Sequence, residues 1–319
     1  MANDRIITNN MNIPLPLAVW IAIDNYDYND DPRVISTTTL LKPIRQIILA
    51  RQNMDCLKIM DCDNLIAVSM GSALHDSVEQ AWKDRDKAIT AMVALGLTAE
   101  NAEAIFDATS FETRLTKEIN GWTVSGKYDI VSEGRVCDIK SSSVYGYITG
   151  SSDNQYMMQM SIYKWLDPAL ITDDIGTNLY IFTDWSKAKT LSDPTYPKSR
   201  IQSKDHRLKS VTETQRYIEK KLFQIDKFLP ITDQDLIPDC TPEELWQEKD
   251  VFKYYKDPTK TARATKNYDT YDEAADHLRR DGNVGIIIKH EGKAKACQYC
   301  SVANLCAQRV RLAASGRLA

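Results

Sequence analysis

The segment from residue 122 to residue 140 constrains the fold of this 319-residue chain more strongly than any other. It holds two runs of β-branched and aromatic residues, Trp122–Val131 and Arg135–Lys140, on either side of a Ser-Glu-Gly turn signal. Runs of this kind around a glycine-containing turn predict an antiparallel β-hairpin. If Glu133 and Gly134 form a two-residue turn, the register of the whole hairpin follows.

This register brings charged side chains together on one face of the hairpin. Ile130 is expected to pair with Cys137 and Asp129 to lie opposite Asp138, where two like charges destabilise a sheet. Because side chains alternate along a strand, Lys140 shares the face of Asp138 and Cys137 points to the other face. Two carboxylates and a lysine so arranged favour a hard divalent cation, which can activate water and stabilise a transferring phosphoryl group. The alternative interpretation is a solvated surface hairpin that carries charges.

The hairpin contains two short motifs, G-x-x-D at Gly126 and Asp129 and D-x-K at Asp138 and Lys140. Together they resemble the active-site signature of PD-(D/E)XK nucleases. The RecB-like exonuclease branch, with the AddB nuclease domain, the CRISPR-adaptation nucleases and phage exonucleases, is the most similar. The resemblance extends over about residues 35 to 170 and the cysteines near the end of the chain.

A helix upstream of the hairpin carries the first supporting residue. Residues 71–95 have apolar side chains at helical spacing, which predicts an amphipathic helix. His75 lies beside the apolar stripe, at the place of the branch's motif histidine. A lone histidine there is otherwise structural, but neutral imidazole is a common metal ligand.

Three further positions resemble the branch. Glu112 resembles its preceding acidic position, although Glu118 lies close enough to be the alternative. Gln159 and Tyr163 match its Q-x-x-x-Y helix, and residues four apart share a helix face. The resemblance implies that these two side chains contact the DNA backbone or support the catalytic lysine; the alternative is a position at the edge of the core.

The resemblance also implies a metal site and a reaction. His75, Asp129, Asp138 and the Ile139 carbonyl are expected to hold Mg²⁺ or Mn²⁺. Lys140 is expected to position or deprotonate the attacking water and to stabilise the developing negative charge.

Three cysteines near the end of the chain form a C-x2-C-x5-C pattern at Cys297, Cys300 and Cys306. Seven cysteines in a chain without a secretory signal favour metal binding over disulfides. In the resembling nucleases this spacing holds three ligands of a [4Fe–4S] cluster. A structural zinc ion is the alternative, with a fourth cysteine or with His290. Cys137 is expected to be a free core cysteine.

The fourth ligand departs from the pattern of the branch. Lys42 stands where the branch has a cysteine. Cys240 is the preferred substitute, because it precedes a Thr-Pro-x-Glu signal for a helix around Trp246. Cys56 and Cys62 are the alternatives.

The expected architecture is α/β, with a PD-(D/E)XK core of a central mixed sheet flanked by helices and a C-terminal cysteine lobe. The expected division is a peripheral extension at residues 1–34, the core at 35–230 and the lobe at 231–319. Further expected elements are an entry helix within 35–58, a strand Thr177–Thr183, helices Val211–Phe228 and Tyr271–Arg280, and a strand Val284–Ile288.

The resulting functional expectation is a metal-dependent DNA exonuclease of recombination, repair or phage DNA metabolism, with a helicase, recombinase or annealing protein as partner. The net charge of -4 gives no global signal for nucleic acid, so DNA would need a local basic patch such as residues 187–221. The sequence shows no long apolar run and no secretory signal, which favours the cytoplasm over a membrane. A catalytically silent nucleic-acid-binding protein and an RNA-directed nuclease are the alternatives.

Overall fold

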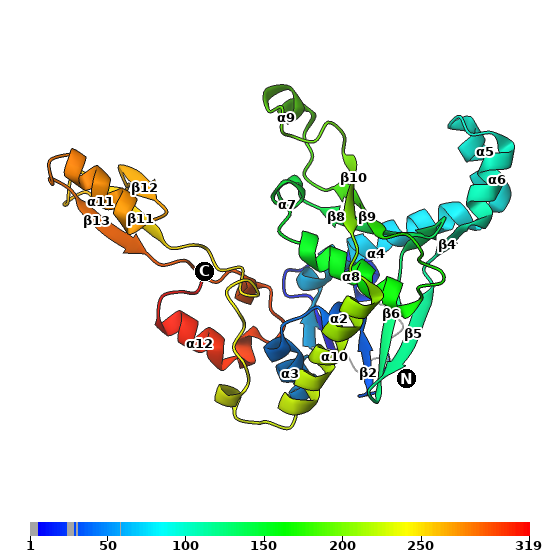
Figure 1. The fold of residues 1–319 in the computed structure, drawn as a ribbon, viewed down its shortest axis with the longest axis horizontal. Coiled ribbons are helices and arrows are strands. Elements are labelled where there is room, and N and C mark those ends of the chain that lie inside the picture. The colour runs from blue at the N-terminus through cyan, green and yellow to red at the C-terminus, as the bar shows by residue number, and fades with distance from the viewer. Residues whose placement is uncertain (1–5, 24–28, 30, 58) are drawn as a thin grey trace. The chain divides into compact units, whose positions relative to one another are not determined.

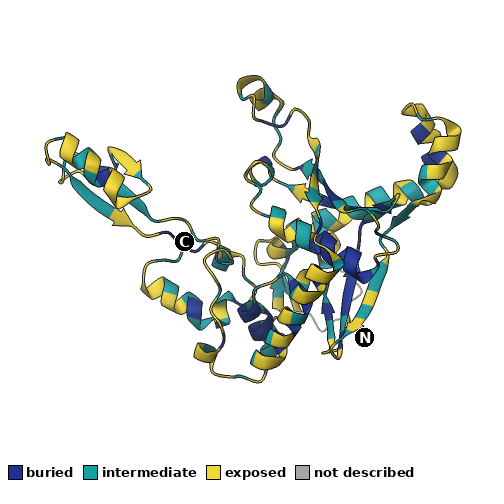
Figure 2. Ribbon diagram, viewed as in Figure 1, coloured by how far each residue is buried: buried dark blue, intermediate teal, exposed yellow. Residues whose placement is uncertain are grey.

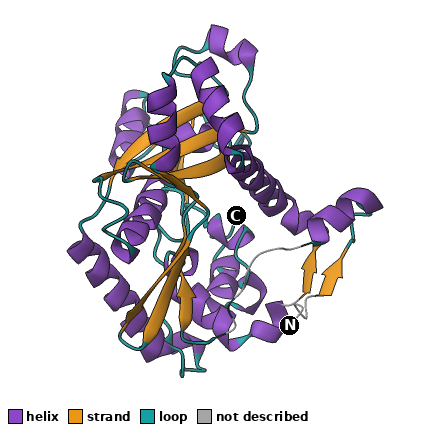
Figure 3. Ribbon diagram, turned by 90° about the vertical axis from the view of Figure 1, so that its right-hand side faces the viewer, coloured by secondary structure: helices purple, strands orange, loops and turns teal. Residues whose placement is uncertain are grey.

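The computed structural model of the protein describes residues 6–23, 29, 31–57 and 59–319 (Figure 1). Its internal contacts divide the chain into two units, residues 1–42 with 58–224 and residues 43–57 with 225–319. The domain boundaries predicted from the sequence, at residues 34 and 230, stay a prediction. The architecture is mixed α/β, with mixed sheets flanked by helices (Figure 3).

The first unit contains ten strands and most of the helices that the structure describes. Its strands are β1 (Ile6–Thr8), β2 (Val34–Ser36), β3 (Ile59–Asp61), β4 (Thr109–Phe111), β5 (Arg114–Ile119), β6 (Trp122–Lys127), β7 (Ile130–Ser132), β8 (Arg135–Ser142), β9 (Ile175–Phe182) and β10 (Ile201–Arg207). Its helices are α1 (Leu15–Ala22), α2 (Thr37–Leu40), α4 (Cys62–Lys83), α5 (Arg85–Ala94), α6 (Ala99–Asp107), α7 (Val144–Thr149), α8 (Asp153–Leu166), α9 (Lys187–Ser192) and the larger part of α10 (Val211–Phe228).

A five-stranded sheet with the order β10-β9-β8-β7-β4 forms the centre of this unit. Strands β8 and β9 are parallel and the other neighbours are antiparallel. A three-stranded sheet, β2-β6-β5, lies beside helix α8, which also contacts β8 and β9. Because α8 packs against both sheets, all of its residues from Gln159 to Leu166 are buried, whereas α9 has no buried residue (Figure 2).

The predicted hairpin is confirmed in its turn and in the register from Ile130 to Ser132, whereas the expected pair of Asp129 with Asp138 lies outside β7. Strands β7 and β8 pair Ile130 with Cys137. The two residues of the turn, Glu133 and Gly134, have φ angles of 49° and 79°. Two successive positive φ angles match the right-handed twist of the flanking strands, as in the primed hairpin turns.

The predicted strand Trp122–Val131 is wrong in one respect, because it is two strands in two different sheets. Strand β6 pairs with β5 in the three-stranded sheet, and β7 pairs with β4 in the five-stranded sheet. Both strand pairs bend at the same place, where the amide of Glu112 donates to the carbonyl of Asp129 at 3.0 Å. Glu112 has a φ of 47°, a left-handed conformation that non-glycine residues adopt mainly where the surroundings enforce it. The bend therefore places two carboxylates side by side.

Three predicted helices also differ from those in the structure. The helix predicted over residues 71–95 is divided between two helices, α4 and α5. Asp84 has an extended backbone that ends α4, and its side chain accepts a hydrogen bond from the Lys87 amide and so caps the start of α5. Within residues 35–58, Pro43 separates α2 from α3 (Ile44–Gln52). The helix expected around Trp246 is only one turn, because Trp246 has a left-handed φ of 47°.

The second unit consists of short elements around the cysteine loop. They are α3, η1 (Met54–Leu57), the end of α10, η2 (Gln234–Leu236), β11 (Val251–Tyr255), β12 (Lys266–Tyr268), α11 (Tyr271–Arg280), β13 (Ile286–His290), η3 (Ala296–Gln298), η4 (Ala303–Leu305) and α12 (Ala307–Ala314). The predicted bounds of α10 and α11 are confirmed to the residue. No helix among the described residues is both long and apolar enough to span a membrane.

Candidate metal centre

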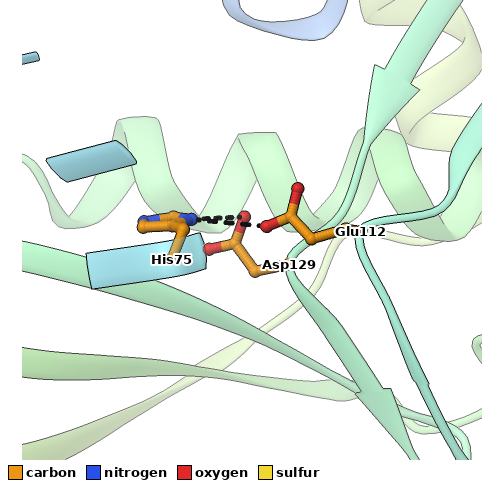
Figure 4. A group of neighbouring side chains, drawn as sticks. All are labelled: His75, Glu112 and Asp129. Carbon is orange, nitrogen blue, oxygen red and sulfur yellow. Dashed lines mark ion pairs between the residues drawn. The ribbon is translucent and has the colours of Figure 1, made fainter. Parts of the chain in front are cut away.

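Three side chains converge beside the bend between the two sheets (Figure 4). His75 of α4 places its Nδ1 atom 3.3 Å from Oδ1 of Asp129 and 3.6 Å from Oε1 of Glu112. Their ligand atoms all lie within 4.8 Å of one another, and among the described residues this is the one group of three or more His, Cys, Asp or Glu side chains that does so. These residues could hold a metal ion.

The histidine in this group is strongly biased towards its protonated form. Burial opposes the charge, but hydrogen bonds to Asp129 and Glu112, together with their charges, raise the pKa of His75 to about 10. A proton on Nδ1 therefore supplies positive charge between the two carboxylates. A bound cation would compete with that proton, because imidazole ligates metals in its neutral form.

Glu112 is held as an anion by its neighbours. Burial raises the pKa of its carboxyl group, but hydrogen bonds from His75 and Lys127 outweigh this effect and lower it. The Lys127 Nζ atom lies 2.5 Å from Oε2 of Glu112, while Oε1 faces His75. One oxygen is thus neutralised by a lysine and the other contributes to the candidate site.

Asp138 is buried next to this group, with 1% of its surface exposed. Burial raises its pKa to about 6, although the charge of Lys140 opposes the shift. Its Oδ2 atom lies 2.5 Å from Nζ of Lys140 and accepts from Nδ2 of Asn178 at 3.0 Å. Its Oδ1 atom is buried and has no hydrogen-bond partner among the described residues.

Lys140 is fixed by a chain of polar contacts. Its Nζ atom donates to Oε1 of Gln159 at 3.3 Å, and Nε2 of Gln159 donates to the hydroxyl of Tyr163 at 2.8 Å. Nζ also lies 4.8 Å from the centre of the Tyr156 ring. Burial disfavours the charge, but Asp138 outweighs it and raises the pKa of Lys140. The lysine is therefore a fixed positive charge.

The donor set fits a hard divalent cation. Carboxylate oxygens are the ligands that suit Mg²⁺ and Mn²⁺ in proteins, and a neutral imidazole is a common metal ligand. The unpartnered Oδ1 of buried Asp138 fits as well, because a buried acceptor without a hydrogen-bond partner is unfavourable and a cation would satisfy it. His75, Glu112 and Asp129 form the close group. Asp138 is outside this group but interacts electrostatically with two of its members, Asp129 and His75.

The structure brings most of the predicted site residues together, but the close group differs from the predicted ligand set in one carboxylate. Of the four predicted ligands, His75 and Asp129 are in the close group, whose third member is Glu112 rather than Asp138. The Ile139 amide donates to Oδ2 of Asp129 at 2.7 Å, and its carbonyl as a ligand stays a prediction. Glu118, the alternative to Glu112, lies in β5.

Sequence reasoning missed two residues that contact the site. Lys127, which pairs with Glu112, directly follows the motif glycine, and its charge was the available signal. Asn178 lies in the predicted strand after the Gln159 helix. Only the register of β8 against β9, which pairs Asp138 with Asn178, reveals its contact.

The four cysteines predicted as ligands all lie in the second unit, but no three of these described side chains bring their sulfur atoms within 4.8 Å of one another. Burial, together with Glu244, Cys306 and Cys300, raises the pKa of the Cys240 thiol to about 12. Burial also raises the pKa of Cys297, with a further contribution from Cys300 and Cys306. These interactions place Cys300 and Cys306 in the electrostatic surroundings of both Cys240 and Cys297.

Two polar residues hold this cluster. Gln308 of α12 accepts from the Cys240 amide at 2.8 Å and donates to its carbonyl at 3.0 Å. Arg45 of α3 has 1% of its surface exposed, and its Nε donates to Sγ of Cys306 at 3.3 Å. The same guanidinium donates to the Ile237 carbonyl at 2.8 Å and to Asp239 at 3.0 Å.

The other candidate cysteine-site residues have separate surroundings. Cys62 is buried in an apolar cluster with Ala18 and Ile21. The side chain of Cys56 lies outside the described residues. His290, the alternative zinc ligand, lies at the end of β13 with Nε2 3.3 Å from the Tyr255 hydroxyl.

Comparisons with known proteins give distant likenesses in structure alone. No protein-family model matches the chain, and the curated proteins contain no match. A crystal structure of SSO0001 is 18% identical, with a TM-score of 0.42 and coverage of 65% of this chain and 83% of that chain. The crystal structure of a phage-related exonuclease from Haemophilus somnus 129PT is 16% identical, with a TM-score of 0.27 and coverage of 48% of this chain and 70% of that chain. Likenesses of this size assign neither a family nor an activity to the chain.

Proposed function

We propose that this protein is a divalent-metal-dependent nuclease that hydrolyses phosphodiester bonds of DNA from an end. The observation that carries the proposal is the convergence of His75, Glu112 and Asp129 next to the pair formed by Asp138 and Lys140. Acidic and imidazole ligands beside a fixed ammonium group suit a reaction in which negative charge develops on a phosphoryl group.

The residues of the site would have two roles, metal binding and stabilisation of charge. His75, Glu112 and Asp129 would hold Mg²⁺ or Mn²⁺, with Oδ1 of Asp138 facing the same ion. When bound, such an ion stabilises charge on a phosphoryl oxygen and makes water more acidic. Lys140 would stabilise the developing charge as an ammonium group.

Lys140 would act as a charged group, because Asp138 raises the pKa of its amine in the metal-free protein, and deprotonation of the attacking water by Lys140 is the alternative. Gln159 and Tyr163 would act on the lysine rather than on the substrate, since Gln159 links the Tyr163 hydroxyl to Nζ.

The experiment that tests this proposal is a Mg²⁺ and Mn²⁺ titration of cleavage on end-labelled single-stranded and duplex DNA, beside covalently closed circular DNA and end-labelled RNA. We expect metal-dependent release of nucleotides from the linear DNA and none from the closed circle. Cleavage of the circle would replace the end-directed activity with an internal one, and cleavage of RNA alone would replace the substrate. Binding of DNA without cleavage in either metal would support a catalytically silent binding protein instead.

We further propose that Cys240, Cys297, Cys300 and Cys306 hold a [4Fe–4S] cluster, with structural zinc as the alternative. Supporting features are the buried Arg45, whose N–H group points at the sulfur of Cys306, and the electrostatic interaction of Cys300 and Cys306 with the Cys240 thiol. A cationic donor beside a cysteine sulfur suits a thiolate, which is the form that ligates metals. Such a centre would tie residue 240 to the loop at 297–306.

Metal analysis of protein purified without oxygen tests the cysteine proposal. Iron, with sulfide and a broad absorbance at about 400 nm, is the expected result for an iron–sulfur centre. Stoichiometric zinc in colourless protein would establish the alternative, and a stable protein without either metal would contradict both.

A further inference from the structure

Asn178 is a buried polar residue that contacts the candidate active site from a neighbouring strand. It lies in β9, directly beside Asp138 in the parallel register with β8, and it is 0% exposed. Its Nδ2 atom donates to Oδ2 of Asp138 at 3.0 Å. A fully buried amide needs a reason for its position, because burying polar atoms is unfavourable unless they are paired.

The two oxygens of Asp138 are used unequally. Oδ2 receives both the Asn178 amide and the ammonium group of Lys140, which lies 2.5 Å away. Oδ1 is buried and receives no hydrogen bond from any described residue. Two donors on a single oxygen fix the orientation of the carboxylate plane and leave the other oxygen available for a ligand.

The chemistry of the amide suits this task better than a second cation would. A carboxylate that already pairs with one lysine keeps little affinity for a metal if another cation neutralises it. An amide N–H group orients the carboxylate and adds no charge, so Asp138 can still attract a divalent ion. Oδ1 of Asn178 is also buried and without a partner among the described residues, so a second unpaired acceptor belongs to the side chain that orients Asp138.

We propose that Asn178 is a positioning residue of the metal site, which with Lys140 holds Asp138 by Oδ2 so that Oδ1 faces a hydrated divalent cation. This inference rests on the proposed metal-dependent function and assigns to it a residue outside the sequence motifs. Residues that orient metal ligands typically change metal affinity by about 10–100-fold when they are replaced.

The test compares Asn178→Val with Asn178→Thr, which have nearly the same shape and differ in the hydroxyl donor. Thr177→Val is the matched control. Thr177 is also buried in β9, but side chains alternate along a strand, and its hydroxyl donates to Asp205 at 2.7 Å on the other face. Mn²⁺ affinity is measured by calorimetry, the Mg²⁺ dependence of DNA cleavage by kinetics, and folding by circular dichroism and the melting temperature.

We expect Asn178→Val to bind Mn²⁺ about 10-fold or more weakly than the unmodified protein. Its cleavage defect should shrink at saturating metal, and Asn178→Thr should be less impaired. Thr177→Val should lose stability while its metal affinity stays unchanged. A purely structural role would lower the melting temperature of Asn178→Val without changing the metal dependence.

Two results would overturn the inference while the proposed function stands. One is Mn²⁺ affinity of Asn178→Val equal to that of the unmodified protein, and the other is an equal loss in the Val and Thr variants. If the unmodified protein binds no Mn²⁺ or Mg²⁺, the proposed function fails, and this inference fails with it.

Discussion

The backbone amide of Ile139 donates a hydrogen bond to Oδ2 of Asp129 at 2.7 Å, which ties the end of one sheet to the middle strand of the other. With Oδ2 occupied in this way, Oδ1 of Asp129 faces His75 at 3.3 Å. Asp129 therefore has the same arrangement as Asp138, with one oxygen held by the protein and the other left for the site. The hairpin fixes both carboxylates before any metal binds.

Replacement of the lysine tests its role as a fixed charge. We expect Lys140→Ala to abolish metal-dependent cleavage while the fold survives, and Lys140→Arg to retain part of it, because the positive charge is kept. Since the pKa of Lys140 is raised, deprotonation of this residue should not set the pH–rate profile near neutrality. Full activity in a purified Lys140→Ala protein would contradict the assignment.

Metal affinity should rise with pH. In the metal-free protein the pKa of His75 is about 10, so at neutral pH a proton must leave before the imidazole can ligate a metal. From pH 7 to 8, above the pKa of about 6 of Asp138, Mn²⁺ binding should therefore strengthen by up to about tenfold, with about one proton released per ion. Calorimetry in buffers of different ionisation enthalpy measures that proton, and a pH-independent affinity would exclude His75 as a ligand.

The stability of the metal-free protein should change with pH in the opposite direction. The pKa of His75 is 6.5 in the unfolded chain and higher in the folded protein. Its ion pairs therefore contribute their full stabilisation below pH 6.5. This contribution is lost as the pH rises towards 10. The melting temperature of the metal-free protein should fall over this range more in the unmodified protein than in His75→Gln, and parallel curves would contradict the ion-pair geometry.

The motif glycine should be required for packing. A Cβ atom at Gly126 would lie 2.6 Å from Oγ1 of Thr37, 2.8 Å from Cδ1 of Leu166 and 2.9 Å from Cε1 of Tyr163. Gly126→Ala should therefore destabilise the fold by about 1–3 kcal/mol, as overpacked cores do. Gly71→Ala is the matched control, because its Cβ would meet only the Ser141 Oγ atom at 3.8 Å and alanine favours a helix. Denaturant unfolding of both variants decides the point, and equal stabilities would contradict it.

Removal of the cysteines should separate ligands from core residues. Alanine at Cys240, or at any cysteine of the 297–306 triplet, should remove the bound metal and loosen the second unit, because a centre joining them closes a loop of roughly 60 residues. Cys137→Ala and Cys62→Ala should keep the metal. Metal content and melting temperature are the measurements, and retention of metal in Cys240→Ala would exclude it as the fourth ligand.

Arg45 should matter to the same unit for a different reason. Arg45→Met keeps the length of the side chain but leaves the Ile237 carbonyl and the Cys306 sulfur without their donor. A loss of about 1–3 kcal/mol is expected for the unsatisfied acceptors. If Cys306 ligates a metal, the variant should also release that metal faster to a chelator. An unchanged release rate would show that Arg45 does not contribute to metal binding by the cysteines.

The sequence predicted the features that depend on interactions between residues close together in the chain. The turn at Glu133 and Gly134 and the register of β7 against β8 follow from local turn chemistry, and the helix α11 follows from its Thr270 cap and its periodicity. The chain after Cys240 shows the limit of this reasoning. Thr241 and Glu244 do form a reciprocal capping box, but left-handed Trp246 ends the helix after one turn.

The parts that the sequence did not predict depend on contacts between distant segments. The sequence predicts Glu112 as a site residue, but its place in the close group with His75 and Asp129 depends on the common bend of two strand pairs between two sheets, which no local pattern reports. Asn178 reaches Asp138 only through the parallel register of β8 and β9. Arg45 lies beside Cys306 although 261 residues separate them in the chain.

The most direct test of the central claim is the stoichiometry of Mn²⁺ bound by the unmodified protein, by Glu112→Gln and by Glu118→Gln. The two glutamates are close in sequence, but only Glu112 belongs to the group with His75 and Asp129, whereas Glu118 is exposed in β5. We predict one tightly bound ion in the unmodified protein and in Glu118→Gln, with markedly weaker binding in Glu112→Gln. No bound ion in the unmodified protein, or equal affinity in all three proteins, would contradict the assignment of this group as the metal centre.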